Sequence, residues 1–351
     1  MSEMNRISEQ VNRDYSMDIL RILAILIVIL LHVSFPFFDN VFNNTQWIKA
    51  LFPDTMSRWG VPVFVMISGA FMLQKNISIN ELWTKYIKRL AILLVLWNII
   101  YYIPNYQSFN FGVKDILSIF FSSSDGYHLW FLYMLISIYI IIPILKMIVE
   151  GDLTKYVLIL WFCTSILFFW FVQSGTFKYL QTYLLNFPFL CDYVGFFLLG
   201  HYLYKQIILT RRQRIIIYIL GFLALICMSF GTYCASLLYG KTKYFFLENL
   251  SISNVMVSIA LFVFFRYFDF NSSTVFLKLR KIIGILSNLT LGVYLVHIMV
   301  LSILYHYFPV DYYLKWDAAI AIPLIWIVAT LISFIISFIM SKIPYVRILV
   351  K

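Results

Sequence analysis

The chain alternates between long apolar segments and short polar loops. Most of the apolar segments approach the length of about 20 residues that a helix needs to cross a bilayer. There are ten such runs, at residues 18–38, 58–74, 90–104, 128–145, 156–173, 188–204, 215–238, 248–267, 282–304 and 318–340. The second and third are short, and we expect tilted, broken or extended helices there. The pattern predicts an all-α fold, a polytopic bundle of about ten transmembrane helices.

Composition supports a lipid environment for this bundle. Of the 351 residues, 62% are hydrophobic and 12% are charged, whereas a soluble domain carries about 25% charged residues. The first apolar run is long, has no small-residue cleavage site, and contains Arg21 and His32. We therefore expect it to remain as the first span and not to be removed as a signal peptide.

The basic residues predict the orientation of the chain. With the N-terminus in the cytoplasm, 20 of the 27 Lys and Arg residues fall on the cytoplasmic side. The opposite side has the other seven, Lys49, Arg58, Lys114, Lys178, Lys241, Lys243 and Lys315. The positive-inside rule then places both termini in the cytoplasm. This predicts a cytoplasmic segment 1–17, a membrane domain 18–340 and a cytoplasmic tail 341–351.

The net charge of +11 lies in short clusters between apolar runs, so we expect no nucleic-acid partner. The four cysteines and five histidines have no metal-binding spacing, and we expect no metal. A nucleophile elbow, a Gly-rich phosphate loop and a His-Glu metal motif are all missing from the sequence. Hydrolysis by a serine triad or a metal therefore has no support.

Three polar residues stand in the first span, where each needs a reason. Arg21 and His32 are eleven residues apart, which places them on one face of a helix, separated by about 16.5 Å along its axis. Asp18 lies three residues before Arg21 and can pair with it. An imidazole transfers protons near neutral pH, and a guanidinium binds phosphate or carboxylate. The alternatives are a snorkelling Arg21 and a His32 that only makes a hydrogen bond between helices.

The second span contains further candidates. Arg58 precedes "WGVPVFVMISGAFML", in which Ser68 and Gly69 interrupt the apolar run. The following loop ends in "KYIKR", whose Lys88 and Arg89 could hold an anionic cofactor such as a nucleotide. An interfacial charge explains Arg58 as well, and plain topology determination explains the basic cluster equally well.

Later spans contribute aromatic and imidazole groups. "HLWFLYMLISIYIIIP" contains Trp130 and Tyr139, and "LGVYLVHIMV" places Tyr294 and His297 on one helix face. Tyrosines at helical spacing are usually packing residues, and His297 could make an ordinary hydrogen bond between helices.

These motifs resemble those of the membrane-bound acyltransferase 3 family. That family has an aspartate, an arginine and, after ten intervening residues, a histidine in its first helix, as in "MDILRILAILIVILLH". "GVPVFVMISGAFML" behind a basic residue, "HLWFLYMLISIYIIIP", "GFFLLGHYLYK" and "LSNLTLGVYLVH" are similar to its later motifs and stand in the same order. The resemblance covers residues 14 to 340. One departure is the glutamate that many members carry after the fourth-helix tryptophan, because "WFLYMLISIY" has none.

The resemblance implies transfer of an acyl group, commonly acetyl, from acyl-CoA to a hydroxyl of an envelope carbohydrate or lipid-linked glycan. It is closest to the compact branch without a fused outer esterase-like domain. It also implies a multi-pass protein of the cell membrane, and the high content of Ile, Phe, Tyr, Lys and Asn points to an AT-rich bacterial genome. A homo-oligomer is compatible with the sequence.

The roles that we assign are as follows. His32 removes the proton of the acceptor hydroxyl or briefly accepts the acyl group, and Arg21, Lys88 or Arg89 binds the phosphates of the donor. Arg58 or His297 positions the acceptor or stabilises the oxyanion. The predicted substrate-binding residues are Asp18, Arg58, Ser68, Trp130, Tyr139, Tyr294 and His297.

A transporter or flippase of a small molecule or lipid-linked sugar is the rival interpretation. Transport favours matched pairs of broken helices, and the sequence shows no such pair. A third reading, a bundle that only senses or scaffolds, leaves the shared face of Arg21 and His32 without a purpose.

Overall fold

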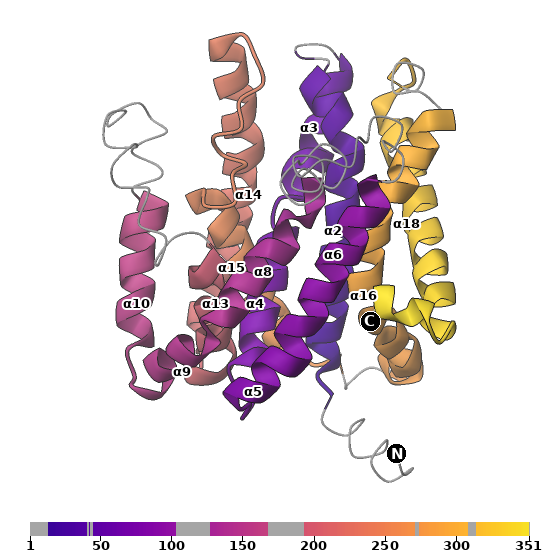
Figure 1. The fold of residues 1–351 in the computed structure, drawn as a ribbon. Coiled ribbons are helices and arrows are strands. Elements are labelled where there is room, and N and C mark those ends of the chain that lie inside the picture. The colour runs from indigo at the N-terminus through magenta and orange to yellow at the C-terminus, as the bar shows by residue number, and fades with distance from the viewer. Residues whose placement is uncertain are drawn as a thin grey trace, which may run out of the picture.

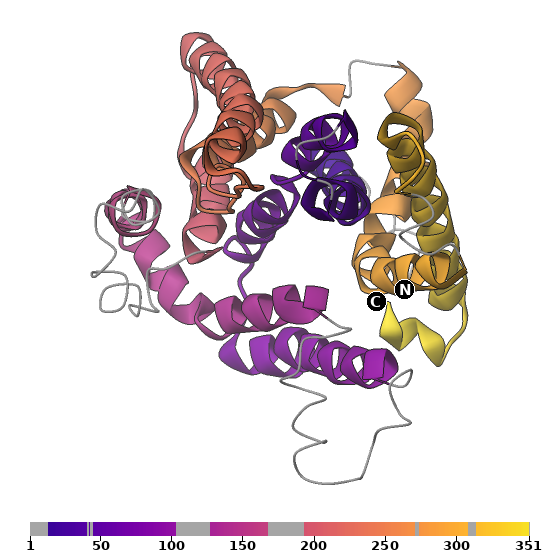
Figure 2. The same ribbon diagram turned by 90° about the horizontal axis from the view of Figure 1, so that it is seen from above.

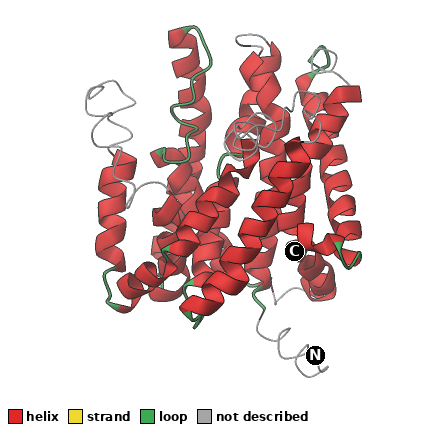
Figure 3. Ribbon diagram, viewed as in Figure 1, coloured by secondary structure: helices red, strands yellow, loops and turns green. Residues whose placement is uncertain are grey.

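The computed structural model describes residues 13–40, 42, 45–102, 127–167, 193–270, 274–307 and 314–350. Within these ranges the chain is helical and contains no strand, which confirms the predicted all-α class (Figure 3). The first half contains α2 (Tyr15–Asn40), α3 (Thr45–Met56), α4 (Gly60–Met72), α5 (Ile79–Glu81), η1 (Leu82–Ile87), α6 (Lys88–Tyr102), η3 (Tyr127–Leu129), α8 (Trp130–Ile140), α9 (Ile142–Glu150), α10 (Thr154–Trp161) and η4 (Phe162–Leu167). The second half contains α13 (Tyr193–His201), η5 (Tyr202–Gln206), α14 (Arg211–Tyr239), α15 (Ile252–Tyr267), α16 (Thr274–Tyr307), α18 (Ala318–Lys342) and η7 (Val346–Leu349).

Each of the ten apolar runs overlaps at least one of these helices. Four helices in the described part of the chain, α2, α14, α16 and α18, are long and apolar enough to cross a membrane, and a bent pair, α8 with α9, makes a fifth. α4, α6 and α15 have 13, 15 and 16 residues, which is shorter than the roughly 20 residues of a full span. The number of crossings therefore stays a prediction.

Several predicted features lie outside the described residues. They are the first twelve residues of the N-terminal segment, the outer-side Lys114 and Lys178, residues 103–104, the end of the fifth run at 168–173, the start of the sixth run at 188–192, and the last residue of the chain.

The run at 128–145 differs from the single span that its pattern predicts. Its helix breaks at Ile141, and α9 leaves α8 at an angle of 54°. Pro143 stands in the first turn of α9, where its missing N–H is tolerated, and its ring prevents α8 from continuing through this point.

The bundle is organised around α2, which contacts α3, α4, α15, α16 and α18 (Figure 1). Beside it, α4 and α13 pack with their backbones in close approach. A Cβ at Gly69 would lie 1.8 Å from the carbonyl oxygen of Phe197, and one at Gly200 would lie 2.0 Å from that of Met66. Only glycine fits at these two positions, so this contact fixes the depth of α4 in the bundle.

The outer surface of α14 is apolar along much of its length. Exposed side chains include Ile216 (55%), Phe222 (64%) and Phe230 (66%). A contiguous apolar surface of this kind is unfavourable in water and suits a lipid environment.

The described chain begins and ends at one end of the bundle, where α2 starts and α18 finishes (Figure 1). The basic connection between α4 and α6 lies at the same end. This arrangement agrees with termini on a common side, while the identity of that side stays a prediction.

Candidate functional site

A cavity of about 530 Å³ opens between five elements of the bundle, and its walls are α2, α4, the η1–α6 segment, α8 and α16. Seen from above, these helices lie around a common interior region (Figure 2). The cavity is lined by Arg21, Val28, Val61, Phe64, Ser68, Met72, Lys75, Tyr86, Arg89, Leu90, Phe131, Leu135, Tyr139, Ser287, Asn288, Thr290, Leu291 and Tyr294.

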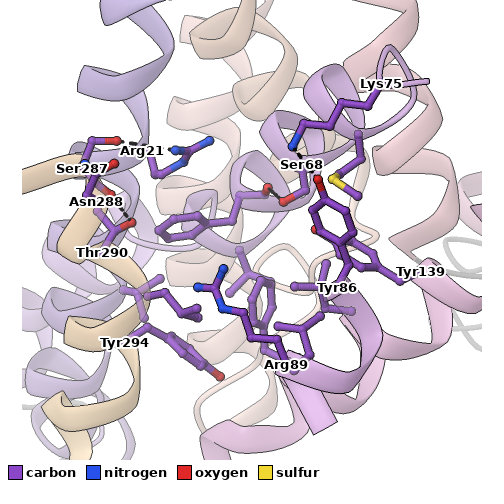
Figure 4. A pocket seen from close by; sticks show the side chains of 18 residues that line it. Arg21, Ser68, Lys75, Tyr86, Arg89, Tyr139, Ser287, Asn288, Thr290 and Tyr294 are labelled. Atoms are coloured by element: carbon purple, nitrogen blue, oxygen red, sulfur yellow. Dashed lines mark hydrogen bonds between the residues drawn. The ribbon is translucent and has the colours of Figure 1, made fainter. Parts of the chain in front are cut away.

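Three cations line one part of this cavity. Arg21 comes from α2, Lys75 follows α4, and Arg89 lies in the first turn of α6, so three separate segments contribute positive charge (Figure 4). The ammonium of Lys75 lies 3.5 Å from the hydroxyl of Tyr86 and 5.1 Å from the centre of its ring. No acidic residue is among the described residues that line the cavity. This region is suited to an anion with several negative oxygens.

Arg21 is held in place by a network between α2 and α16. Its guanidinium lies 3.7 Å from the carboxylate of Asp18 and 3.5 Å from the hydroxyl of Ser287. Ser287 donates to Asp18 at 2.6 Å, and Arg13 pairs with the other oxygen of Asp18. Asp18 is buried behind Arg21 and does not line the cavity. It therefore orients the guanidinium, and the prediction that Asp18 itself contacts substrate gains no support from its position.

The part of the cavity further along the helices is apolar. Val28 follows Arg21 by about two turns of α2, and Leu291 follows Ser287 by about one turn of α16. Phe64, Phe131 and Leu135 from α4 and α8 add to this apolar lining. Ser68 also lines the cavity, but its hydroxyl donates to the Phe64 carbonyl one turn earlier at 2.9 Å. This portion of the cavity suits an alkyl or acyl chain more than a charged group.

Three histidines meet beyond the cavity. The ring of His32 lies 5.2 Å from that of His297, and His297 lies 5.3 Å from His128, between centroids. Tyr294 connects this cluster to the cavity, because it lines the cavity and its ring lies 5.5 Å from His128 and 5.7 Å from His297. The predicted pair of Arg21 and His32 is therefore divided, with the cation in the cavity and the imidazole just past its end.

The hydrogen bonds of the cluster leave several ring nitrogens open. The Nδ1 of His32 lies 3.1 Å from the hydroxyl of Tyr127. The Nδ1 of His297 lies 2.5 Å from the carbonyl oxygen of Tyr294. The Nε2 of His297 and both ring nitrogens of His128 are buried without a hydrogen-bond partner among the described residues, although the Leu295 carbonyl lies near His128. Buried nitrogens of this kind are uncommon, and they mark a site where another group is expected to bind.

Arg58 lies on the far side of His32 from the cavity. It forms an ion pair with the fully buried Asp54, with 3.0 Å between its Nε and the carboxylate, and it lies over the ring of Tyr244 at 5.7 Å. The hydroxyl of Tyr244 donates to Asp39, and burial together with that carboxylate raises the pKa of Tyr244. The guanidinium of Arg58 is close enough for its charge to act on the imidazole of His32. Arg58 is thus held by Asp54 at the end of α3 and borders the approach to His32.

Comparison with known proteins identifies the family. The model of an acyltransferase domain matches residues 14–342, which is nearly the whole chain. The chain belongs to the acyltransferase 3 family. This confirms the resemblance drawn from the five motifs and establishes a membrane acyltransferase at the level of the family. No curated protein and no solved structure shows a significant match to the chain.

In this acyltransferase, Arg21, Ser68, Arg89, Tyr139 and Tyr294 are the predicted site residues that meet in the cavity. His32 and His297 meet each other beyond it. Their chemical roles stay predictions.

Two predicted residues lie elsewhere. Lys88 is exposed and does not line the cavity, although its neighbour Arg89 does. Trp130 is 41% exposed, and its ring lies 5.4 Å from that of Tyr193 on α13. The first turn of α8 directs Trp130 away from the cavity, whereas the next residue, Phe131, lines it.

Several residues of the site were not predicted. Lys75 and Tyr86 complete the cationic region, while Tyr127 and His128 join the histidine cluster. The clearest available signal was for His128, because it is the first residue of the "HLWFLYMLISIYIIIP" motif that the family resemblance had already selected, and Tyr127 directly precedes it.

Proposed function

We propose that this acyltransferase moves an acyl group, acetyl in the first instance, from cytoplasmic acyl-CoA to a hydroxyl of a cell-envelope carbohydrate or lipid-linked glycan. The observation that supports this proposal is the order of chemical environments along the cavity. Three cations are followed by an apolar cavity, and the cavity is followed, through Tyr294, by an imidazole pair.

An acyl-CoA donor has the same order of parts. Its phosphates would bind Arg21, Arg89 and Lys75, with Tyr139 and Tyr86 beside them. Its flexible arm would cross the apolar part of the cavity, and its thioester would reach the histidines. Arg21 and His32 are eleven residues apart in α2, or about 16.5 Å along the helix axis, a distance that such an extended arm can span.

His32 would then act as the general base. The base form of His32 has its proton on Nδ1, where the Tyr127 hydroxyl can accept it, and a lone pair on Nε2. The Nε2 lone pair takes the proton of the acceptor hydroxyl, the hydroxyl oxygen bonds to the thioester carbon, and the carbon–sulfur bond breaks. His32 is only half-buried, and the buried rings of His128 and His297 beside it would limit competing attack by water. Attack by His32 itself on the thioester would give a two-step route.

The acceptor would approach from the side of Arg58, because the donor occupies the other side of His32. Arg58 and its pair with Asp54 would position a hydroxyl-bearing ring there. We place the protein in the bacterial cell membrane, with the cationic region facing the cytoplasm in accordance with the positive-inside rule. A homo-oligomer stays a prediction.

The test compares ester-linked acetyl in purified envelope glycans from four strains. They carry the unchanged protein, no protein, the His32→Ala variant, or the His306→Ala variant as a control. His306 is an exposed histidine at the end of the same helix that contains His297. We expect loss of acetyl in the second and third strains only. Equal acetyl in all four would reject O-acetylation, and normal acetyl with His32→Ala would reject His32 as the base.

The break between α8 and α9 is the observation that favours the rival function, a transporter or flippase. Transporters of this kind place matched broken helices in two repeats around a midplane site. Among the described residues, one such bent pair is found. Uptake of a labelled sugar or small molecule by vesicles without acyl-CoA would support transport, and dependence of labelling on acyl-CoA would support the transferase.

A further inference from the structure

The buried Nε2 atom of His297 has no part in the proton transfer proposed above. His297 is fully buried, and this nitrogen has no hydrogen-bond partner among the described residues. An imidazole nitrogen left without a partner in a buried site is unfavourable, so its retention needs a reason.

The other nitrogen of the ring determines the state of Nε2. The Nδ1 of His297 faces the carbonyl oxygen of Tyr294 at 2.5 Å. A carbonyl oxygen can only accept a hydrogen bond, so Nδ1 must carry the proton. In the neutral ring, Nε2 then has a free lone pair and is ready to accept a proton. His32 is different, because the hydroxyl that faces its Nδ1 can either donate or accept.

His297 lies close to the proposed base and to the donor cavity. Its ring lies 5.2 Å from that of His32, centroid to centroid. It is one helical turn from Tyr294, whose ring lines the donor cavity. In the part of the chain that the structure describes, no ion pair joins a carboxylate to either histidine. The carboxylate that supports the histidine of a serine triad thus has no counterpart among these ion pairs, and the ring that lies beside His32 on α16 is another imidazole.

We propose that His297 is a second proton-transferring residue of this acyltransferase, an inference that rests on the proposed function. The proton of the acceptor hydroxyl moves to Nε2 of His32 and from there to Nε2 of His297. The hydroxyl oxygen forms the ester bond as the carbon–sulfur bond breaks with its electron pair on sulfur. His297 then returns the proton to the thiolate, which leaves as the free thiol. Both histidines end the cycle neutral, so no charge accumulates in the buried site.

His297→Asn is the variant that separates this role from a structural one. The amide nitrogen of asparagine can replace Nδ1 as donor to the Tyr294 carbonyl, but asparagine has no basic Nε2. His201→Asn is the matched control, since His201 is also buried, also has a ring nitrogen without a partner, and lies on α13 outside the cavity and the histidine cluster. Each purified protein is assayed for transfer of labelled acetyl from acetyl-CoA to the glycan fraction, and its thermal unfolding is recorded.

We expect His297→Asn to lower kcat by about 100-fold, the lower range for loss of general acid–base catalysis, with KM for the donor changed less than threefold. His201→Asn should retain kcat within threefold. His297→Glu, which restores a proton acceptor near Nε2, should recover part of the lost rate. Wild-type kcat in a folded His297→Asn protein would overturn the proposal.

Two further outcomes remain distinguishable. If the unchanged protein transfers no acyl group, the result rejects the proposed function, and the inference that rests on it is rejected as well. If neither His297 variant folds, His297→Gln is assayed in their place, because its amide nitrogen can also donate to the Tyr294 carbonyl and it also has no basic nitrogen. A loss of kcat of about 100-fold in this variant supports the relay, whereas wild-type kcat overturns it.

Discussion

Lys88 and Arg89 are adjacent cations that the sequence could not separate, and they provide the sharpest test of the donor site. Arg89 lines the cavity (Figure 4). Lys88 does not line it, although both side chains are exposed. We predict that Arg89→Gln weakens binding of acyl-CoA and that Lys88→Gln does not. The two substitutions remove the same formal charge from neighbouring positions, so an effect of overall charge would appear equally in both.

The size of the effect follows from the partial exposure of Arg89. Two unit charges 4 Å apart interact by about 1 kcal/mol in bulk water and about 4 kcal/mol at an effective dielectric constant of 20. Desolvation of the guanidinium and the phosphate offsets part of this, and a net hydrogen bond to a charged group contributes about 1.5–3 kcal/mol. Because Arg89 is at the open side of the cavity, we take the lower value for the hydrogen bond, about 1.5 kcal/mol. Loss of this energy corresponds to roughly a tenfold increase in Kd.

The Kd for acetyl-CoA is measured by direct binding of the labelled compound to purified protein in lipid nanodiscs, an assay that requires no acceptor. Kd should rise about tenfold for Arg89→Gln and less than twofold for Lys88→Gln, and the difference should shrink with added salt because the contact is partly solvated. Size-exclusion profiles and thermal unfolding verify that both variants are folded. Equal Kd for Arg89→Gln and the unchanged protein, or an equal loss in both variants, would refute the cationic donor site.

Three other predictions follow from the described contacts. His32→Ala should lower acyl transfer by at least 100-fold while leaving the Kd for acetyl-CoA unchanged, and a normal rate would remove His32 from the chemistry. Arg58→Gln leaves the buried Asp54 carboxylate unpaired, which costs about 3 kcal/mol of stability. The double variant Arg58→Gln with Asp54→Asn should regain thermal stability but not acyl transfer. Regained acyl transfer would contradict a role for Arg58 with the acceptor. The Lys49 hydrogen bond lowers the pKa of Asp317 from its ordinary value of 3.8, so this pair stabilises the fold above that pH and the effect is lost as pH falls through the lowered pKa. The difference in Tm between the unchanged protein and Asp317→Asn should therefore vanish in acid, and a constant difference would argue against the pair.

The helices could be located from the sequence because the backbone must satisfy its own hydrogen bonds in lipid. An apolar run of sufficient length therefore leaves helix as the available structure, and each of the ten runs overlaps at least one helix. The break at Ile141 was harder to foresee, since Pro143 near the end of a run is compatible with a helix that simply stops there. The 54° turn into α9 depends on packing at the end of the bundle.

The site was only partly predictable for a related reason. Helical periodicity places Arg21 and His32 on one face, and it places Tyr294 with His297, because these relations are internal to one helix. Whether Lys88 or Arg89 faces the cavity depends on the rotation of α6, which follows the π-helical segment η1. The meeting of His32, His128 and His297 joins three separate segments of the chain, and no periodicity within one segment reports it.

The arrangement of α2 and α16 would set the distance between the phosphates of the proposed donor and the reacting atoms. The two helices run in the same direction, since Asp18 meets Ser287 near one end and His32 meets His297 further along. His32 is eleven residues beyond Arg21, and His297 is ten residues beyond Ser287, which correspond to about 16.5 and 15 Å of helical rise. Because both helices advance at the same rate, contacts at one end keep the other end in register. In the proposed mechanism, a donor whose phosphates bind at Arg21 would therefore reach the histidine pair over a distance that the two helices themselves fix.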